Sequence, residues 1–288
     1  MPMPAPTASP RRAFAAEISR PEPEINLARA ALLVAKEEYP QLSVEQYLAR
    51  LDQLAEEVRD RLDDETAPLV LLDEMGTTLY RRHGFGGNRK AYYDPRNSFL
   101  NDVLDRELGI PLTLGLVFLE VGWRLGLPLE GVNFPSHFLV RYAGDVVRLL
   151  IDPFDGGSLR FEDEAQELLD RSYGGMVKVQ DSFLRAANRR DMLVRLNTNL
   201  KGVYTNVGDH ARALAAVERT LLITPLSPTA NRARGMLLVR LGRHEEAVEQ
   251  LQAYLHVAPG SADAEHVQEM VDALKEGRSP LPEDTEDA

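Results

Sequence analysis

The feature that most constrains the fold of this chain is a segment that recurs after 34 residues near the C-terminal end. Residues 208–225 (GDHARALAAVERTLLITP) align without gaps with residues 242–259 (GRHEEAVEQLQAYLHVAP). The matched positions hold glycine, histidine, alanine, an aliphatic residue or proline, and they are Gly208 and Gly242, His210 and His244, Ala213 and Ala247, Val217 and Leu251, Leu221 and Leu255, and Pro225 and Pro259. A fixed period of this length indicates a stack of similar supersecondary units.

The 34-residue pattern is typical of a tetratricopeptide repeat, in which two helices pack against each other. Glycine suits the turn between the helices, alanine permits a close crossing, and proline follows the second helix. Tyr204 and Leu238 share the same offset. We therefore predict an all-α tetratricopeptide-repeat region over residues 189–276, which ends in a closing helix at 262–275. Stacked helix pairs present a concave surface, so the expected partner is a protein or peptide client.

The composition excludes several classes of function. The 288 residues include 33 Lys and Arg against 45 Asp and Glu, a formal net charge of −12, so no nucleic-acid partner is expected. No apolar run approaches the roughly 20 residues that span a bilayer, which predicts no membrane partner. The chain has no cysteine, which removes disulfides and every thiol nucleophile. Its six histidines show no metal-binding spacing, so we predict neither a metal site nor a cofactor.

Both ends of the chain have the composition of solvated segments. Residues 1–23 hold six prolines and few groups that could pack, which predicts a flexible, proline-rich arm. The pair Arg11-Arg12 is not followed by the apolar core of an export signal, so we expect a cytoplasmic protein. Residues 277–288 predict a solvated acidic tail.

Residues 24–184 predict an α+β domain whose first half is helical. Apolar residues recur at three- and four-residue steps over 44–62 and 67–81, which predicts two amphipathic helices. The segment 112–125 is apolar nearly all round, as expected for a helix buried in the centre of a domain. Three short strand-like runs follow, at 129–134, 137–142 and 146–151. The expected core is a small antiparallel sheet packed on the buried helix.

Motifs in this domain resemble the transglutaminase-like core, a papain-like arrangement with a thiol at the start of a buried helix and a histidine and an aspartate on adjacent strands. The matching positions are Gly109, Gly115 as the small residue, Leu125-Gly126-Leu127-Pro128, His137 in SHFLVRY and Asp152 in IDPF. The blocks YYDPRNS, GIPLTLG and FPSHFLV are similar, more specifically, to the bacterial SirB-type family, which joins a degenerate transglutaminase-like core to a short tetratricopeptide tail. The resemblance covers residues 24–275. It implies this fold and a cytoplasmic setting but no defined activity.

The nucleophile is missing from this pattern. Pro111 stands where the family places its thiol, and proline has neither a nucleophilic atom nor a titratable group. We therefore predict that Pro111, His137 and Asp152 are vestigial positions and not catalytic residues. The His137–Asp152 pair has three open interpretations, as a structural hydrogen bond between two strands, as part of a binding pocket, or as a catalytic pair, of which the structural one is favoured. The hydroxyl of Thr113 points about 200° round the helix from position 111 and is not expected to replace the thiol.

Candidates for binding a ligand or partner surround the vestigial site, and they are Tyr93, Arg96, Asn97, Asn133, His137 and Asp155. The YDPRNS segment also has a purely local interpretation, as a turn and the cap of the next helix. The glycines of GFGG, at 84–87, are not expected to bind phosphate, because no Lys-Ser or Lys-Thr pair follows them.

These observations favour a non-catalytic transglutaminase-like protein, a pseudoenzyme that acts as a cytoplasmic interaction or regulatory scaffold through its tetratricopeptide repeats. One alternative is a hydrolase in which His137 and Asp152 activate water without a thiol. The other is a purely structural subunit of a fixed oligomer. The sequence does not decide whether this protein is an enzyme, but the missing thiol favours a protein without catalytic activity.

Overall fold

The computed structural model describes residues 9–63, 67–144 and 148–278, and its contacts divide the chain into two units. The first unit ends at Leu196 and the second begins at Asn197, inside helix α8 (Arg189–Asn206). The sequence predicts this boundary between residues 184 and 189. It falls later because the first turns of α8 pack within the first unit, where Met192 lies against Gly131. All but the first two residues of the predicted acidic tail lie outside the described residues.

The first described segment corrects the prediction of a flexible arm over residues 1–23. Pro10–Ile18 form helix α1, which is capped by Ser9 and packs against the following helix. Phe14 has no exposed surface, and Ile18 is only 5% exposed. The prolines suggested an unpacked segment, but apolar residues four positions apart share one helix face and can bury it. Residues 1–8 of the predicted arm are outside the described part of the chain.

The helical half of the first unit continues with four helices. They are α2 (Leu27–Glu38), α3 (Val44–Arg59), α4 (Pro68–Gly76) and α5 (Leu100–Arg106). The two predicted amphipathic helices correspond to α3 and α4, and α4 continues into a π-helical turn at Thr77–Arg82. Ser43 caps α3 by accepting a hydrogen bond from the backbone of Gln46. The apolar spacing therefore predicted which residues form these helices.

Helix α6 (Pro111–Arg124) is the buried central helix that the sequence predicted. Twelve of its 14 residues are buried, from Pro111 through Gly122. A Cβ at Gly115 would lie 2.5 Å from the ring of Phe138, so the small residue of the motif gives that ring room. Glycine at this position thus lets the strand that carries Phe138 approach the helix closely.

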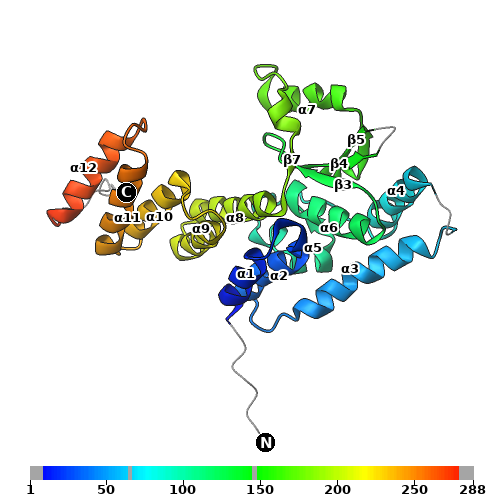
Figure 1. Cartoon of the computed structure of the whole chain (residues 1–288), viewed down its shortest axis with the longest axis horizontal. Coiled ribbons are helices and arrows are strands. Elements are labelled where there is room, and N and C mark those ends of the chain that lie inside the picture. Colours follow the sequence, from blue (N-terminus) through cyan, green and yellow to red (C-terminus); the bar gives the residue numbers. More distant parts are fainter. Residues whose placement is uncertain (1–8, 64–66, 145–147, 279–288) are drawn as a thin grey trace, which may run out of the picture. The chain divides into compact units, whose positions relative to one another are not determined.

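A five-stranded antiparallel sheet lies against α6 (Figure 1). Its strands in spatial order are β6 (Ser158–Arg160), β5 (Arg148–Asp152), β4 (Leu139–Ala143), β3 (Leu129–Val132) and β7 (Ala186–Ala187). The sequence predicted the three central strands. It missed β6 and β7, which have three and two residues and are too short to show an alternating pattern.

The other face of the sheet is covered by helix α7 (Ala165–Tyr173). Leu139 and Leu150 of the sheet pack there with Leu168 and Leu169 of the helix. Two short strands, β1 (Gly86–Gly87) and β2 (Leu108–Gly109), pair in parallel just before α6 begins. The first unit therefore has the predicted α+β, transglutaminase-like architecture, with the sheet between two layers of helix.

The second unit is all helical, as predicted. After α8 its helices are α9 (His210–Ile223), α10 (Pro228–Arg240), α11 (His244–Val257) and α12 (Ala264–Lys275). The repeat is visible in the backbone, because Gly208 and Gly242 have left-handed φ values of +74° and +69° at equivalent turns. Ala213 and Ala247 are both fully buried at the helix crossings. The 34-residue period in the sequence is thus a period in the structure.

Candidate functional site

The site that the sequence singled out lies at the start of α6, where Pro111 is the first helical residue. The backbone N–H of Ile110 donates to the hydroxyl of Thr113 at 3.2 Å. That hydroxyl in turn donates to the carbonyl oxygen of Asn97 at 2.6 Å. Thr113 is fully buried, so its hydroxyl serves the helix cap and is not presented as a nucleophile.

His137 lies in the turn just before β4 and Asp152 ends the neighbouring strand β5, and their side chains meet. His137 Nε2 lies 2.8 Å from Asp152 Oδ1, and the two side chains are 19% and 5% exposed. The same carboxylate oxygen accepts hydrogen bonds from the backbone N–H groups of Phe154 (3.0 Å) and Asp155 (3.2 Å). In the described part of the chain no hydrogen bond reaches His137 Nδ1. The histidine is therefore held through one ring nitrogen while the other keeps its bonding capacity.

Asp152 is ionised in this setting. Burial alone would raise the pKa of its carboxyl group, because burial disfavours the charged form. The hydrogen bond and charge of His137, together with the two backbone N–H groups, outweigh burial and hold the pKa of Asp152 below its ordinary value. Nearby, burial and then the charge of Asp152 raise the pKa of Tyr80 well above its ordinary value. A fixed carboxylate thus orients the imidazole.

A pocket of about 350 Å³ opens onto this pair. Pro111 and His137 both line it, so the position of the missing thiol and the histidine share one cavity. The lining residues that the sequence also picked out are Pro111, His137, Asp152 and Asp155, and those that it did not are Arg89, Tyr92, Ser136, Phe154, Leu168, Arg171 and Ser172.

Phe154 is the aromatic centre of this pocket. The rings of His137 and Tyr92 meet it edge on, with centroid distances of 6.1 and 6.0 Å. The guanidinium of Arg89 lies 4.7 Å from the ring centroid, in a cation–π contact. Gly87, in the GFGG segment, leaves room for this ring, because a Cβ there would clash with it. The glycine therefore has a packing role.

Polar groups at the edge of the pocket include two arginines. Arg89 pairs with Asp155 at 3.2 Å. Arg171, on α7, is exposed and has neither an ion-pair nor a hydrogen-bond partner among the described residues. Ser136 adopts φ +56°, which is uncommon outside glycine, and its hydroxyl lies 2.6 Å from that of Tyr173. This serine bonds to a tyrosine, and in the described part of the chain neither Ser136 nor Ser172 is hydrogen-bonded to His137 as a nucleophile is to its base.

Four of the predicted binding residues lie outside the lining of this pocket. Arg96 pairs at the surface with Asp94 at 2.7 Å. Tyr93 is 67% exposed and stacks edge on against Tyr92. Asn133 is half-buried, and its Oδ1 has no hydrogen-bond partner among the described residues. These side chains are not brought to His137 by the fold.

Asn97 is the fourth of these residues and is fully buried. Its amide nitrogen donates to the backbone carbonyls of Ala91 (2.7 Å) and Tyr92 (3.1 Å), and its amide oxygen accepts from Asn88 (3.0 Å). This network fixes the loop that carries Tyr92 into the pocket. The contacts of Asn97 are therefore local, as expected if the YDPRNS segment forms a turn ahead of the next helix.

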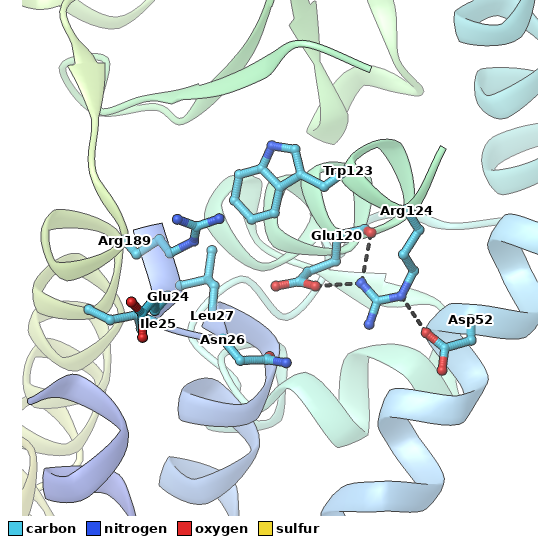
Figure 2. A pocket seen from close by; sticks show the side chains of 9 residues that line it. All are labelled: Glu24, Ile25, Asn26, Leu27, Asp52, Glu120, Trp123, Arg124 and Arg189. Carbon is cyan, nitrogen blue, oxygen red and sulfur yellow. Dashed lines mark hydrogen bonds and ion pairs between the residues drawn. The ribbon is translucent and has the colours of Figure 1, made fainter. Parts of the chain in front are cut away.

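A second pocket, of about 420 Å³, lies at the other end of α6 (Figure 2). Glu120 is only 5% exposed, and its carboxylate accepts hydrogen bonds from the backbone N–H of Ala28 (2.8 Å) and from Arg124 (2.5 Å). Arg124 also pairs with Asp52 at 2.6 Å. This chain of bonds joins α6 to the start of α2 and to α3. These bonds explain why a nearly apolar, buried helix contains the charged residue Glu120.

Figure 2 shows Trp123 and Arg189 beside the same cavity. The guanidinium of Arg189 lies 4.8 Å from the indole centroid and also donates to the carbonyl oxygen of Glu22 at 3.1 Å. The indole N–H of Trp123 donates to the carbonyl oxygen of Leu129 at 2.8 Å. These contacts join the beginning of α8 to α6 and to Glu22, and they join α6 to β3.

Residues 9–63, 67–144 and 148–278 contain no group of three or more His, Asp or Glu side chains placed to hold a metal ion. Among the helices within those ranges, none has the length and apolar character that crossing a membrane requires.

Family models match both parts of the chain. Residues 45–198 match the model of the transglutaminase-like superfamily, and residues 200–272 match that of the tetratricopeptide repeat. Fold and site therefore define a transglutaminase-like protein with a tetratricopeptide-repeat region. Relatives identify a narrower group. The UPF0162 protein of Xylella fastidiosa is 36% identical over 244 residues, which cover 84% of this chain and 87% of the relative.

The chain belongs to the UPF0162 family. The UPF0162 protein of Vibrio cholerae is 28% identical over 251 residues, which cover 87% of this chain and 93% of the relative. A shorter similarity reaches a human protein, F-box only protein 21, which is 44% identical over 85 residues and covers 30% of this chain and 14% of its own length. No solved structure matches the chain significantly.

Proposed function

We propose that this protein is a non-catalytic transglutaminase-like protein that acts as an interaction or regulatory scaffold through its tetratricopeptide repeats. One observation carries the proposal. His137 and Asp152 have the hydrogen-bonded geometry of a base and its orienting carboxylate, while Pro111 occupies the nucleophile position of the same pocket and the chain has no cysteine. A base without a nucleophile cannot carry out acyl transfer through a thiol intermediate.

The repeat region is the expected interaction surface, because stacked helix pairs bind extended segments of other proteins. The match to the tetratricopeptide repeat over residues 200–272 supports this part of the proposal. The net charge of −12 supports a protein client over a nucleic acid. A cytoplasmic location, the absence of a membrane partner and the SirB-type affiliation belong to the same proposal.

The vestigial pocket has a subsidiary binding role in this proposal. His137 Nδ1 and the guanidinium of Arg171 have bonding capacity to spare and line the pocket together. A polar group of a client or ligand can therefore bind there, with Asp155 as a further contact. Tyr93, Arg96, Asn97 and Asn133 act in this scheme only through the loops that they belong to.

Cross-linking mass spectrometry on the full-length chain in bacterial lysate tests the scaffold role. We expect a client whose cross-links map to the second unit and persist in His137→Ala. Cross-links that cluster round the vestigial pocket and vanish in His137→Ala would move the function to that pocket. A chain that acquires no client under any condition would contradict the scaffold.

A panel of amide and ester substrates tests the alternative, in which His137 and Asp152 activate water. The proposal predicts no turnover that depends on His137. Turnover that His137→Ala abolishes, with a pH profile that follows the ionisation of an imidazole, would identify a hydrolase and overturn the proposal.

A further inference from the structure

A groove of about 610 Å³ lies within the second unit, between the two helices that begin successive helix pairs. Lys201 comes from α8, and Arg232, Met236 and Arg240 come from α10. His210, the first residue of α9, completes the lining at one end. All of these residues belong to the second unit, so the groove is a property of the repeats themselves.

The charged side chains of the groove have one sign. Among the described residues, its lining contains Lys201, Arg232 and Arg240, together with His210, and no aspartate or glutamate. Arg232 has a partner, because it pairs with Asp263. Lys201 and Arg240 have no hydrogen-bond or ion-pair partner in the described part of the chain. The groove therefore concentrates positive charge in a protein whose net charge is −12.

Two further features indicate that the groove accommodates more than water. His210 Nδ1 is buried and lacks a hydrogen-bond partner among the described residues. A buried polar atom without a partner is unfavourable, and a bound polar group would relieve it. Ala233, Met236 and Leu237 line the space between the cations and form an apolar surface. Methionine in particular adapts to side chains of different shape.

We propose that this groove binds an extended, acidic peptide segment of a partner protein, with carboxylates on Lys201 and Arg240 and aliphatic side chains against Met236. The inference rests on the proposed scaffold function and names the chemistry of its client. Charge complementarity favours an acidic occupant and speeds its association. A nucleic acid fits less well, because no Phe, Tyr or Trp among the described residues lines the groove to stack on a base, and the whole chain repels a long polyanion.

The test uses the full-length chain and a fluorescein-labelled octapeptide of alternating glutamate and leucine, with fluorescence anisotropy as the readout. We expect the octapeptide to bind, and binding to weaken as salt increases. A peptide with lysine in place of glutamate, and one with serine in place of leucine, should bind at least about tenfold more weakly, as lost charge and apolar contacts each predict.

The matched variants are Lys201→Glu/Arg240→Glu and, to protect against misfolding, Lys201→Gln/Arg240→Gln. Each variant should lower the affinity for the octapeptide by at least about tenfold. Lys275 is an exposed lysine on α12 outside the groove, so Lys275→Glu should leave the affinity unchanged. Circular dichroism checks that each variant is folded. Unchanged affinity in both folded double variants would overturn the proposal.

The remaining outcomes separate this inference from the scaffold function. Oligothymidylate that binds in the groove more tightly than the octapeptide would contradict the acidic-peptide assignment. A client that cross-links to the second unit but is not released by Lys201→Gln/Arg240→Gln would contradict the groove and leave the scaffold intact. Displacement of the octapeptide by a synthetic peptide of residues 279–288, at equal affinity, would assign the groove to the chain's own acidic segment and overturn the partner assignment.

Discussion

The pocket that contains His137 and the pocket that contains Glu120 lie at opposite ends of α6 and use their charged groups in different ways. At the end of the helix, the carboxylate of Glu120 and the guanidinium of Arg124 are bonded to protein partners. At the start, His137 has one bonded and one unbonded ring nitrogen, and Arg171 has no partner in the described residues. Charges that are bonded within the protein hold helices together, whereas charges with bonding capacity to spare can meet a ligand.

Among the substitutions that test this difference, Glu120→Ala is expected to have the largest effect on stability. It removes the acceptor for Ala28 and leaves Arg124 without its buried partner. We expect the free energy of unfolding of the first unit to fall by about 3 kcal/mol, as when one partner of a buried pair is removed. Urea unfolding followed by the fluorescence of Trp123, the only tryptophan, measures this change.

Asp52→Ala is the matched control, because it removes the partner of Arg124 that is 60% exposed. Its expected loss is less than about 1 kcal/mol, as for other exposed ion pairs. Equal losses in the two variants would show that the Glu120 interactions are not what joins α6 to α2.

Asp152→Asn tests the start of the helix through pH. The pKa of Asp152 is lower in the folded than in the unfolded chain, so its carboxylate stabilises the fold above the unfolded pKa of about 4. This stabilisation is lost as the pH falls through the folded pKa. We expect the variant to be less stable than the wild type by about 1–2 kcal/mol at neutral pH, and the two proteins to converge in acid. A difference that is constant across pH would contradict the assigned charge state.

Arg189→Ala is expected to have the smallest effect. The variant loses the cation–π contact with Trp123, which contributes about 0.5–1 kcal/mol at a partly exposed site. The emission of the single tryptophan should shift, because the charge over its ring is gone. Arg185→Ala, at an exposed arginine outside this pocket, should leave the emission unchanged. Identical spectra for the two variants would argue that Arg189 does not hold the indole.

Periodic patterns predicted the elements that repeat or extend. The apolar run of α6 and the paired glycines Gly208 and Gly242 each specify a local structure through many neighbouring residues. Helix α1 was missed because prolines are frequent in residues 1–23, although the helix itself contains only Pro10 and buries Phe14 and Ile18 on one face. The edge strands β6 and β7 were missed because their extended structure comes from pairing with β5 and β3, and their own sequences show no strand pattern.

Some residues of the candidate site could likewise be predicted from the sequence, and others could not. His137 and Asp152 could be predicted, since the strand order places them side by side. Arg171 could not, because it reaches the pocket through the packing of α7 and carries no motif. The contacts of Asn97 could not be predicted, because a polar residue in a turn motif looks the same whether it meets a ligand or the backbone, and here its amide donates to Ala91 and Tyr92.

The most direct test of the central claim returns the thiol to the vestigial pocket. Pro111→Cys gives the chain a single cysteine, so the pH dependence of its alkylation by iodoacetamide reports on that thiol alone. We predict a thiol pKa well below the ordinary value of about 8.5, because the helix start and His137 stabilise the thiolate. His137→Ala in the same background should raise it, and Ser182→Cys, at an exposed position, should titrate normally. A thiol at position 111 that titrates like the one at 182 would contradict the claim that this pocket lacks only its nucleophile.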